Sequence, residues 1–159
     1  MAKTSAGLLM YRRRGERLEV FLVHPGGPFW ARKDRGAWSI PKGECAAGEE
    51  PLAVARREFA EETGRAAGGE AIALSPIRQK GGKIVHAFVL EGDVDPTKLN
   101  SNRFVIQWPP RSGRQQEFPE VDRAGWFGLA EARQKLLASQ HGLLDQLVAL
   151  TGPARARTG

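Results

Sequence analysis

The chain has 159 residues, of which 41% are hydrophobic and 26% charged, and this composition excludes wholesale disorder. Lysine and arginine number 24 against 18 aspartate and glutamate residues, which gives a formal net charge of +6. This excess is compatible with a nucleic acid, an anionic membrane surface or a small polyanionic substrate as partner. The single cysteine, Cys45, excludes an intramolecular disulfide framework and fits a reducing compartment.

The length suits one domain with a buried core, which we expect to cover 1–150, followed by a basic tail over 151–159. No apolar run approaches the roughly 20 residues that a membrane-spanning helix needs. The amino terminus is apolar before it becomes basic, which is the reverse of the order in a signal peptide. We therefore expect a cytoplasmic protein that has no membrane partner.

The amino-terminal part of the chain predicts a β-hairpin. Two apolar stretches, 5–11 and 18–23, flank a polar turn that contains glycine. The segment 24–36 is rich in Gly, Pro and charge and predicts a loop, and 38–40 predicts a short strand before Pro41.

A helix is predicted from Pro51 to Thr63. Glu49 and Glu50 lie at its start, where the helix dipole favours negative charge, and proline suits the first turn. Gly64 fits the position at which a helix ends.

The rest of the chain predicts four further strands and two helices. The strands cover 72–80, 84–90, 104–108 and 124–127, and the helices cover 130–138 and 143–150. Between the last two strands, 109–119 predicts a basic, flexible loop. This order of elements indicates an α/β or α+β fold with a mixed sheet.

Three carboxylates on the predicted helix carry the chemical signal. Glu58, Glu61 and Glu62 are spaced i, i+3 and i+4, so they share one face, which borders the apolar stripe of the helix. Their mutual repulsion calls for positive charge, which Arg57 supplies in part and a hard divalent cation would supply more fully. A solvated acidic helix face is the alternative interpretation of the same spacing.

The surrounding segment resembles the Nudix box, G-x5-E-x7-R-E-U-x-E-E-x-G-U, in which U is a bulky apolar residue. Eight of the nine defined positions match, and only Arg65 departs from the pattern. The matching residues are Gly43, Glu49, Arg57, Glu58, Phe59, Glu61, Glu62 and Gly64. The residues WSIPKG before the box are similar to the strand and turn that lead into it in many Nudix hydrolases.

This resemblance implies an α/β/α sandwich around a mixed sheet. It also implies hydrolysis of a nucleoside diphosphate linked to another group, by attack of a metal-bound water with Mg²⁺ or Mn²⁺ as cofactor. The implied metal ligands are Glu58, Glu61 and Glu62, with the Gly43 carbonyl and Glu120 as further candidates. The implied catalytic set is Glu58, Glu61, Arg57 and Glu120. Arg57, together with Glu49 outside this set, is implied to orient the carboxylates. Glu120 is either a ligand or the base, and Glu117 is its nearby competitor.

Candidate substrate ligands lie outside the box. Arg78, Lys80 and Lys83 surround two glycines, which indicates either a phosphate-binding turn or an ordinary hairpin with solvated lysines. His86 stacks on a base, bonds to phosphate or is structural, and Lys42 adds basic charge just before the box.

Aromatic residues beside cations indicate a lid or an entrance. Trp108 lies close to Arg111 and Arg114, and Phe29 and Trp30 are similar candidates. Each of these rings is alternatively a packing residue.

The charge distribution favours a small phosphorylated substrate, a nucleotide, over a nucleic acid. Six of the 18 acidic residues lie between positions 44 and 62, so the remainder of the chain is more basic than the total suggests. We expect a nucleoside or dinucleoside polyphosphate of the diadenosine tetraphosphate type. The alternatives are an oxidised nucleoside triphosphate, an inositol pyrophosphate, or a Nudix-like module that binds a nucleotide or RNA without cleaving it.

Overall fold

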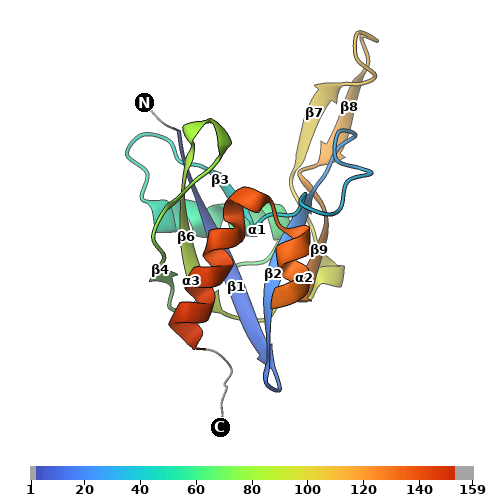
Figure 1. The fold of residues 1–159 in the computed structure, drawn as a ribbon. Helices are drawn as coiled ribbons and strands as arrows, with labels where there is room; N and C mark the ends of the chain where they lie inside the picture. The colour runs from blue at the N-terminus through green and yellow to red at the C-terminus, as the bar shows by residue number, and fades with distance from the viewer. Residues whose placement is uncertain (1–2, 153–159) are drawn as a thin grey trace.

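A computed structural model describes residues 3–152 of the chain (Figure 1). Its strands are β1 (Thr4–Arg14), β2 (Arg17–Pro25), β3 (Lys42–Glu44), β4 (Ile72–Ala73), β5 (Ile77–Arg78), β6 (Ile84–Glu91), β7 (Arg103–Gln107), β8 (Gln115–Pro119) and β9 (Val121–Gly128). Its helices are α1 (Pro51–Thr63), α2 (Leu129–Lys135) and α3 (His141–Thr151), with short 3₁₀ turns at Lys80–Gly82, Pro96–Lys98 and Ala138–Gln140. No helix within residues 3–152 is both long and apolar enough to cross a membrane.

Seven strands form one mixed sheet. Strand β1 pairs with β6 in parallel and with β2 and β3 in antiparallel orientation, and β9 pairs with β2. Strand β1 changes partner along its length, because Tyr11–Arg14 pair with β2 whereas Ser5–Gly7 pair with β3. The sheet therefore splits between β2 and β3.

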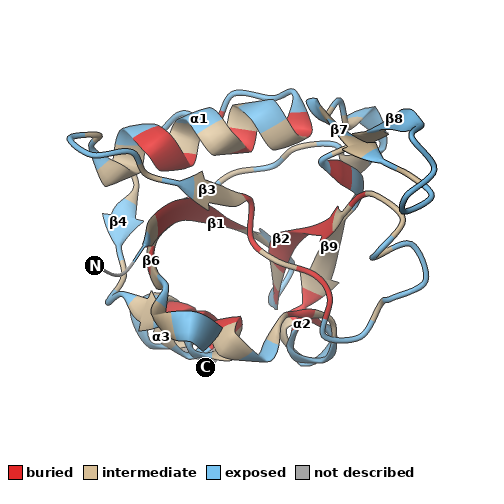
Figure 2. Cartoon of the chain, turned by 90° about the horizontal axis from the view of Figure 1, so that it is seen from above, coloured by how far each residue is buried: buried red, intermediate tan, exposed pale blue. Residues whose placement is uncertain are grey.

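Helices cover both faces of this sheet, in three layers (Figure 2). Helix α1 lies on one face, where Val54, Ala55 and Phe59 are buried together with Leu8 and Phe21 of the sheet. Helices α2 and α3 lie on the other face, over a second cluster built from the alternate side chains of the same strands. The expected α/β/α sandwich with a mixed sheet is confirmed.

Helix α1 begins and ends at the predicted residues, with Pro51 and Gly64 in their predicted places and Glu50 as a hydrogen-bonding cap. The side chain of Glu50 accepts a hydrogen bond from the backbone of Ala53, and Pro51 occupies the first turn. Gly64 ends the helix in the left-handed region, at φ 77°, and its N–H donates to the carbonyl of Ala60.

Two strands project from the sandwich as an arm. The arm consists of β7, the connection 108–114 and β8, and these two strands form a sheet of their own. In Figure 1 it rises from the end of the sandwich at which β2 and β9 meet the loop after β2.

The structure corrects three predicted elements. Segment 38–40 makes only isolated bridges, to Val23 and Leu136, and the strand lies at Lys42–Glu44 instead. The strand predicted for 72–80 is divided into β4 and β5. Half of the loop predicted for 109–119 is strand β8.

The predicted basic tail lies mostly outside the described residues. Of 151–159, only Thr151 and Gly152 are described, and Thr151 still belongs to α3.

Candidate active site

A cavity of about 240 Å³ opens where the sheet splits. The end of β2, the segment that leads into β3, the last turn of α1 and the start of β9 all contribute to its wall. Its lining residues are Val23, Pro25, Trp30, Ala37, Ser39, Ile40, Lys42, Glu62, Glu120, Val121 and Leu137. Three charged side chains, Lys42, Glu62 and Glu120, thus share an otherwise largely apolar wall.

Glu62 is the carboxylate most perturbed by this environment. Its pKa is raised to about 8, mainly by burial and also by the nearby Glu58 and Glu120, whereas Lys42 opposes the shift. Burial likewise lowers the pKa of Lys42, against the effect of Glu62. The ionised form of Glu62 is therefore disfavoured here unless a further cation binds nearby.

Glu58 lies against the backbone of Gly43. A Cβ atom at position 43 would collide with the carboxyl group of Glu58, so only glycine allows this approach of β3 to α1. Burial raises the pKa of Glu58, and repulsion from Glu61, Glu120 and Glu49 adds to this effect, which Arg57 counteracts. The strand–helix packing thus places the Glu58 carboxylate against the backbone of Gly43, and both stay predicted metal ligands.

Arg57 is held mainly by Glu49, which limits how far it neutralises the other carboxylates. Its Nη1 donates to Glu49 Oε2 at 2.5 Å, while Glu58 and Glu61 lie at 3.8 and 3.9 Å. Glu49 also accepts a hydrogen bond of 2.7 Å from the backbone of Ala46, and the bond from Arg57 lowers the pKa of Glu49. Arg57 thus joins Glu49 to the edge of the carboxylate group, an arrangement compatible with the orienting role that the family resemblance implies for both.

The structure separates the two candidates for the distal acid. Glu120 lines the cavity and lies close enough to raise the pKa of Glu58 and of Glu62. Glu117 lies on the arm, where its Oε1 is 3.1 Å from Nε of Arg103 in an exposed ion pair. The geometry thus favours Glu120.

The carboxylate group fits a hard divalent cation. Glu58, Glu61, Glu62 and Glu120 offer oxygen donors, and the burial and mutual repulsion of Glu58 and Glu62 are incompletely neutralised by protein cations. Within residues 3–152, no three His, Cys, Asp or Glu side chains converge into a ready cluster of metal ligands. Mg²⁺ normally completes its shell with water and substrate phosphates, so an open donor set suits it.

The predicted substrate ligands do not gather in one place. Lys42 lines the cavity, whereas Arg78, Lys80 and Lys83 are exposed around the 3₁₀ turn before β6 and do not line it. His86 pairs with Ala6 and alternates with buried neighbours, so it shares the α1 face of the sheet and stays outside the cavity wall.

Several cavity residues were not predicted from the sequence. Ser39 accepts a hydrogen bond of 3.0 Å from the buried Gln140, which also binds the backbone of Ile40 at 3.1 Å. This contact joins the cavity wall to the turn before α3, a link over 101 residues that no local pattern could indicate.

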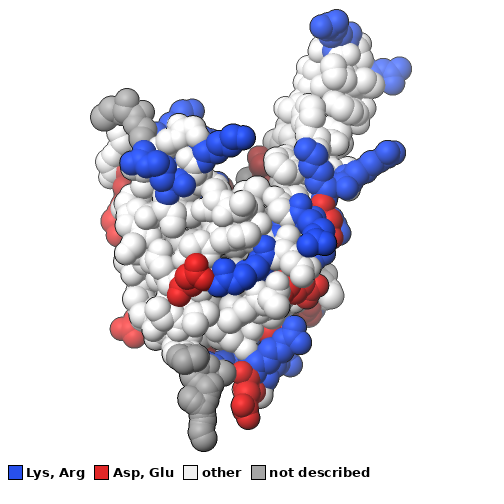
Figure 3. All heavy atoms as spheres, viewed as in Figure 1, with Lys and Arg blue, Asp and Glu red and all other residues white. Residues whose placement is uncertain are grey.

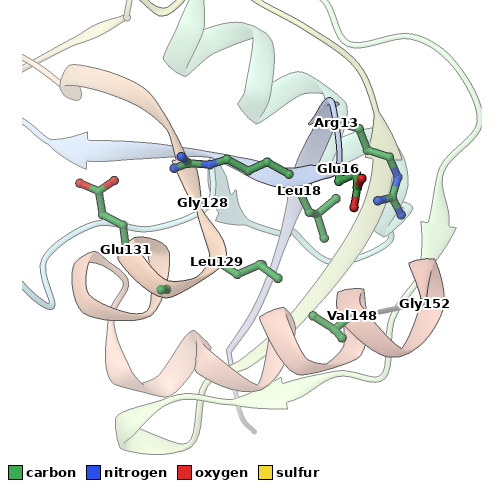
Figure 4. A pocket seen from close by; sticks show the side chains of 10 residues that line it. Arg13, Glu16, Leu18, Gly128, Leu129, Glu131, Val148 and Gly152 are labelled. Carbon is green, nitrogen blue, oxygen red and sulfur yellow. The ribbon is translucent and has the colours of Figure 1, made fainter. Parts of the chain in front are cut away.

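A second cavity, of about 510 Å³, lies at the opposite end of β2 (Figure 4). Arg13, Arg17, Leu18, Leu129 and Val148 are among its lining residues. None of the predicted catalytic, metal-binding or substrate-binding residues lines it, so the candidate active site is the cavity beside α1.

The three-layer sandwich and the glutamates of α1 beside Gly43 define a hydrolase of the Nudix type. A model of the NUDIX domain matches residues 1–147, and the chain therefore belongs to the Nudix family. Its activity is that of a Nudix-family pyrophosphohydrolase.

Solved structures of low sequence identity share this fold. The NUDIX domain of Shewanella oneidensis NrtR, complexed with ADP ribose, matches with a TM-score of 0.66 and 18% identity, over 96% of this chain and 90% of that chain. An Ap4A hydrolase of C. elegans matches with 0.61 and 22%, over 94% and 98%. The E. coli ORF135 protein matches with 0.55 and 23%, over 98% and 96%. No curated protein sequence matches the chain significantly.

Proposed function

We propose that this chain hydrolyses a dinucleoside polyphosphate of the diadenosine tetraphosphate type at a phosphoanhydride bond, with Mg²⁺ or Mn²⁺ as cofactor. The observation that carries the proposal is the distribution of charge about the cavity. Glu62 and Glu120 line the cavity with Lys42, Lys83 lies close enough to Lys42 to lower its pKa, and further exposed cations lie in the loop after β2. A long polyphosphate requires both a metal site and protein cations, because its negative charge exceeds what the bound metal can neutralise.

One flank is the turn before β6, with Arg78, Lys80 and Lys83. The other is the loop after β2 together with the arm, and Figure 3 shows blue side chains on both sides of a notch in the surface. In the loop, Arg32, Lys33 and Arg35 are exposed. A polyanion lying across the notch would meet cations at both ends.

In this proposal, Glu58, Glu61 and Glu62 hold the metal together with the Gly43 carbonyl. A bound divalent cation supplies neutralisation of phosphate oxygens and acidification of water. Glu120 takes the proton that the attacking water releases, since it shares the cavity with Glu62. Lys42 faces the negative charge that develops on the phosphate oxygens.

A substrate panel tests the proposal. Turnover is measured with Mg²⁺ for diadenosine tetraphosphate, an oxidised guanosine triphosphate, an inositol pyrophosphate and ADP-ribose, with wild type, Glu62→Gln and the exposed control Glu70→Gln. We expect the dinucleoside compound to give the highest kcat/KM, Glu62→Gln to lower kcat by about 10²–10⁴-fold, and Glu70→Gln to change nothing.

Equal turnover by wild type and Glu62→Gln would overturn the catalytic assignment. A higher kcat/KM for the triphosphate or the inositol compound would contradict the proposed substrate and put that compound in its place. Tight, salt-dependent RNA binding without any hydrolysis would favour the binding module instead.

A further inference from the structure

Two aromatic side chains in contact with each other, the exposed Phe29 and the half-buried Trp108, are not among the residues that line the cavity. Phe29, in the loop after β2, is 64% exposed. Its ring meets that of Trp108 on the arm, with centroids 5.3 Å apart and planes at 78°. Rings that served only to fasten the arm to the loop would be expected to bury each other, but Phe29 leaves most of its surface to solvent.

These rings continue the cavity wall outward. Trp30 lines the cavity beside Glu62 and Glu120, and its chain neighbour Phe29 reaches Trp108. Nζ of Lys33 lies 5.3 Å from the centroid of Trp30, so a cation accompanies the first ring. We call Trp30, Phe29 and Trp108 the aromatic path.

The outer end of the path is held in place and is basic. The backbone N–H of Trp108 donates to the carbonyl of Arg114 at 2.9 Å, and its carbonyl accepts from the amide of Gln116 at 2.9 Å. Arg111 and Arg114 follow Trp108 in the exposed connection between the strands, and Figure 3 shows blue side chains at the tip of the arm.

The length of the arm determines which ligands can contact the carboxylates and the outer ring, Trp108, at the same time. The N–H of Asn102, at the base of the arm, donates to the backbone carbonyl of Glu61 at 2.8 Å. Trp108 lies six positions after Asn102 along extended chain, roughly 20 Å at 3.4 Å per residue. A mononucleotide held at the carboxylates is too short to span this distance, whereas a second nucleoside on a polyphosphate chain extends in that direction.

We infer that the aromatic path is the binding site for the second nucleoside of a dinucleoside polyphosphate. Its base stacks on Phe29 and Trp108, and Arg111 and Arg114 bind the adjacent phosphates. Stacking suits this role because every nucleobase presents an aromatic face. The inference rests on the proposed function, in that it names where the far half of the proposed substrate lies.

The path favours a small ligand over single-stranded nucleic acid. Phe29 and Trp108 form one pair of rings outside the cavity, and Phe29 is the chain neighbour of Trp30, which lines the cavity with Glu62 and Glu120. Nucleic acid instead requires a groove in which successive bases find successive rings.

The test uses the whole chain and compares two substrates. For wild type, Phe29→Ala, Trp108→Ala, Trp108→Phe and Val105→Ala, kcat/KM is measured with diadenosine tetraphosphate and with adenosine tetraphosphate, which lacks the second nucleoside. Val105 is the control, because it is 57% exposed on the same arm but is not aromatic.

Both alanine variants at the rings should lose about tenfold in kcat/KM on the dinucleoside, through KM, and less than twofold on the mononucleoside. Trp108→Phe should restore most of the loss, and Val105→Ala should leave both substrates unaffected. Equal losses on the two substrates, or no loss on either, would overturn the inference, because a merely structural role predicts no discrimination.

A binding measurement separates this inference from the proposed function. If wild type cleaves neither compound, the proposed function fails, and affinity for diadenosine tetraphosphate measured by calorimetry then decides the inference. A tenfold weaker affinity in Trp108→Ala supports the path, and an unchanged affinity overturns it. Tighter Trp108-dependent binding of single-stranded oligoadenylate than of the dinucleoside also overturns it, in favour of a nucleic-acid surface.

Discussion

Helix α1 contributes Glu62 to the cavity, the arm ends just before Glu120 of the same cavity, and the two are built in opposite ways. Helix α1 buries Val54, Ala55 and Phe59 in the core and is capped at both ends. The arm pairs only with itself and exposes most of its side chains. Reacting groups need a fixed geometry, which a packed helix supplies, whereas recognition of a ligand is readily placed on projecting segments. The contrast suggests that chemistry resides on α1 and substrate choice on the arm.

The largest expected effect tests whether chemistry needs the oxygen donors around α1. Removing divalent metal with EDTA should lower kcat by roughly a thousandfold or more, because metal contributes several kcal/mol of charge stabilisation in the transition state. Added Mg²⁺ or Mn²⁺ should restore it. Full activity in EDTA, with the absence of metal checked by elemental analysis, would contradict a catalytic role for a divalent cation.

A pair of carboxylate variants then separates the cavity from the arm. Glu120→Gln should lower kcat by about 10²-fold, since it removes the proposed proton acceptor. Glu117→Gln should stay within twofold of wild type, because Glu117 takes part only in an exposed ion pair with Arg103. If steady-state kinetics found the larger loss of kcat in Glu117→Gln, the general base would be Glu117 on the arm and not Glu120.

The close approach of β3 to α1 can be tested by adding one methyl group. Gly43→Ala should cost about 1–3 kcal/mol of unfolding free energy and about tenfold in kcat, because the new Cβ would displace the Glu58 carboxyl group. Gly68→Ala is the matched control, since nothing lies within 4 Å of its Cβ position. Urea denaturation that found the two variants equally stable would contradict the packing described.

A smaller effect concerns the stability of the metal-free protein. In the folded chain, burial raises the pKa of Glu62 to about 8 from the ordinary 4.5. The folded state therefore binds the extra proton, so its stabilisation is complete below pH 4.5 and is lost as pH rises through about 8. Glu62→Gln should therefore be more stable than wild type at pH 9, by up to roughly 5 kcal/mol, and similar to it at pH 4. Equal denaturation midpoints of the two proteins at pH 9 would contradict this environment for Glu62.

The same contrast explains which elements could be predicted from the sequence. Helix α1 was predicted to the residue, because Glu50, Pro51 and Gly64 are local signals that the fold uses as they stand. The sequence predicts a loop where strand β8, QQEFP, forms, because a strand without a core carries no alternation of apolar and polar residues. The strand predicted at 38–40 failed for another reason, since β3 forms where Lys42–Glu44 find Ser5–Gly7, a pairing that only the tertiary fold reveals.

The residues of the candidate site also differ in how far local sequence signals predict them. The spacing of Glu58, Glu61 and Glu62 placed them on one helix face, and Gly43 joined them through the family resemblance. Cavity walls that depend on distant pairing, such as Ser39 with Gln140, had no local signal. His86 shows the limit for substrate ligands, because one residue of register decides which face of a strand a side chain occupies.

Hydrolysis of diadenosine tetraphosphate in water labelled with heavy oxygen tests the central claim most directly. The claim is that the carboxylates of α1, with Mg²⁺, promote attack of water on phosphorus. Mass spectrometry of the products should find one labelled oxygen per cleavage on a nucleotide phosphate with wild type, and almost no product with Glu62→Gln. Unlabelled products, or labelled products formed equally well by Glu62→Gln, would contradict the account.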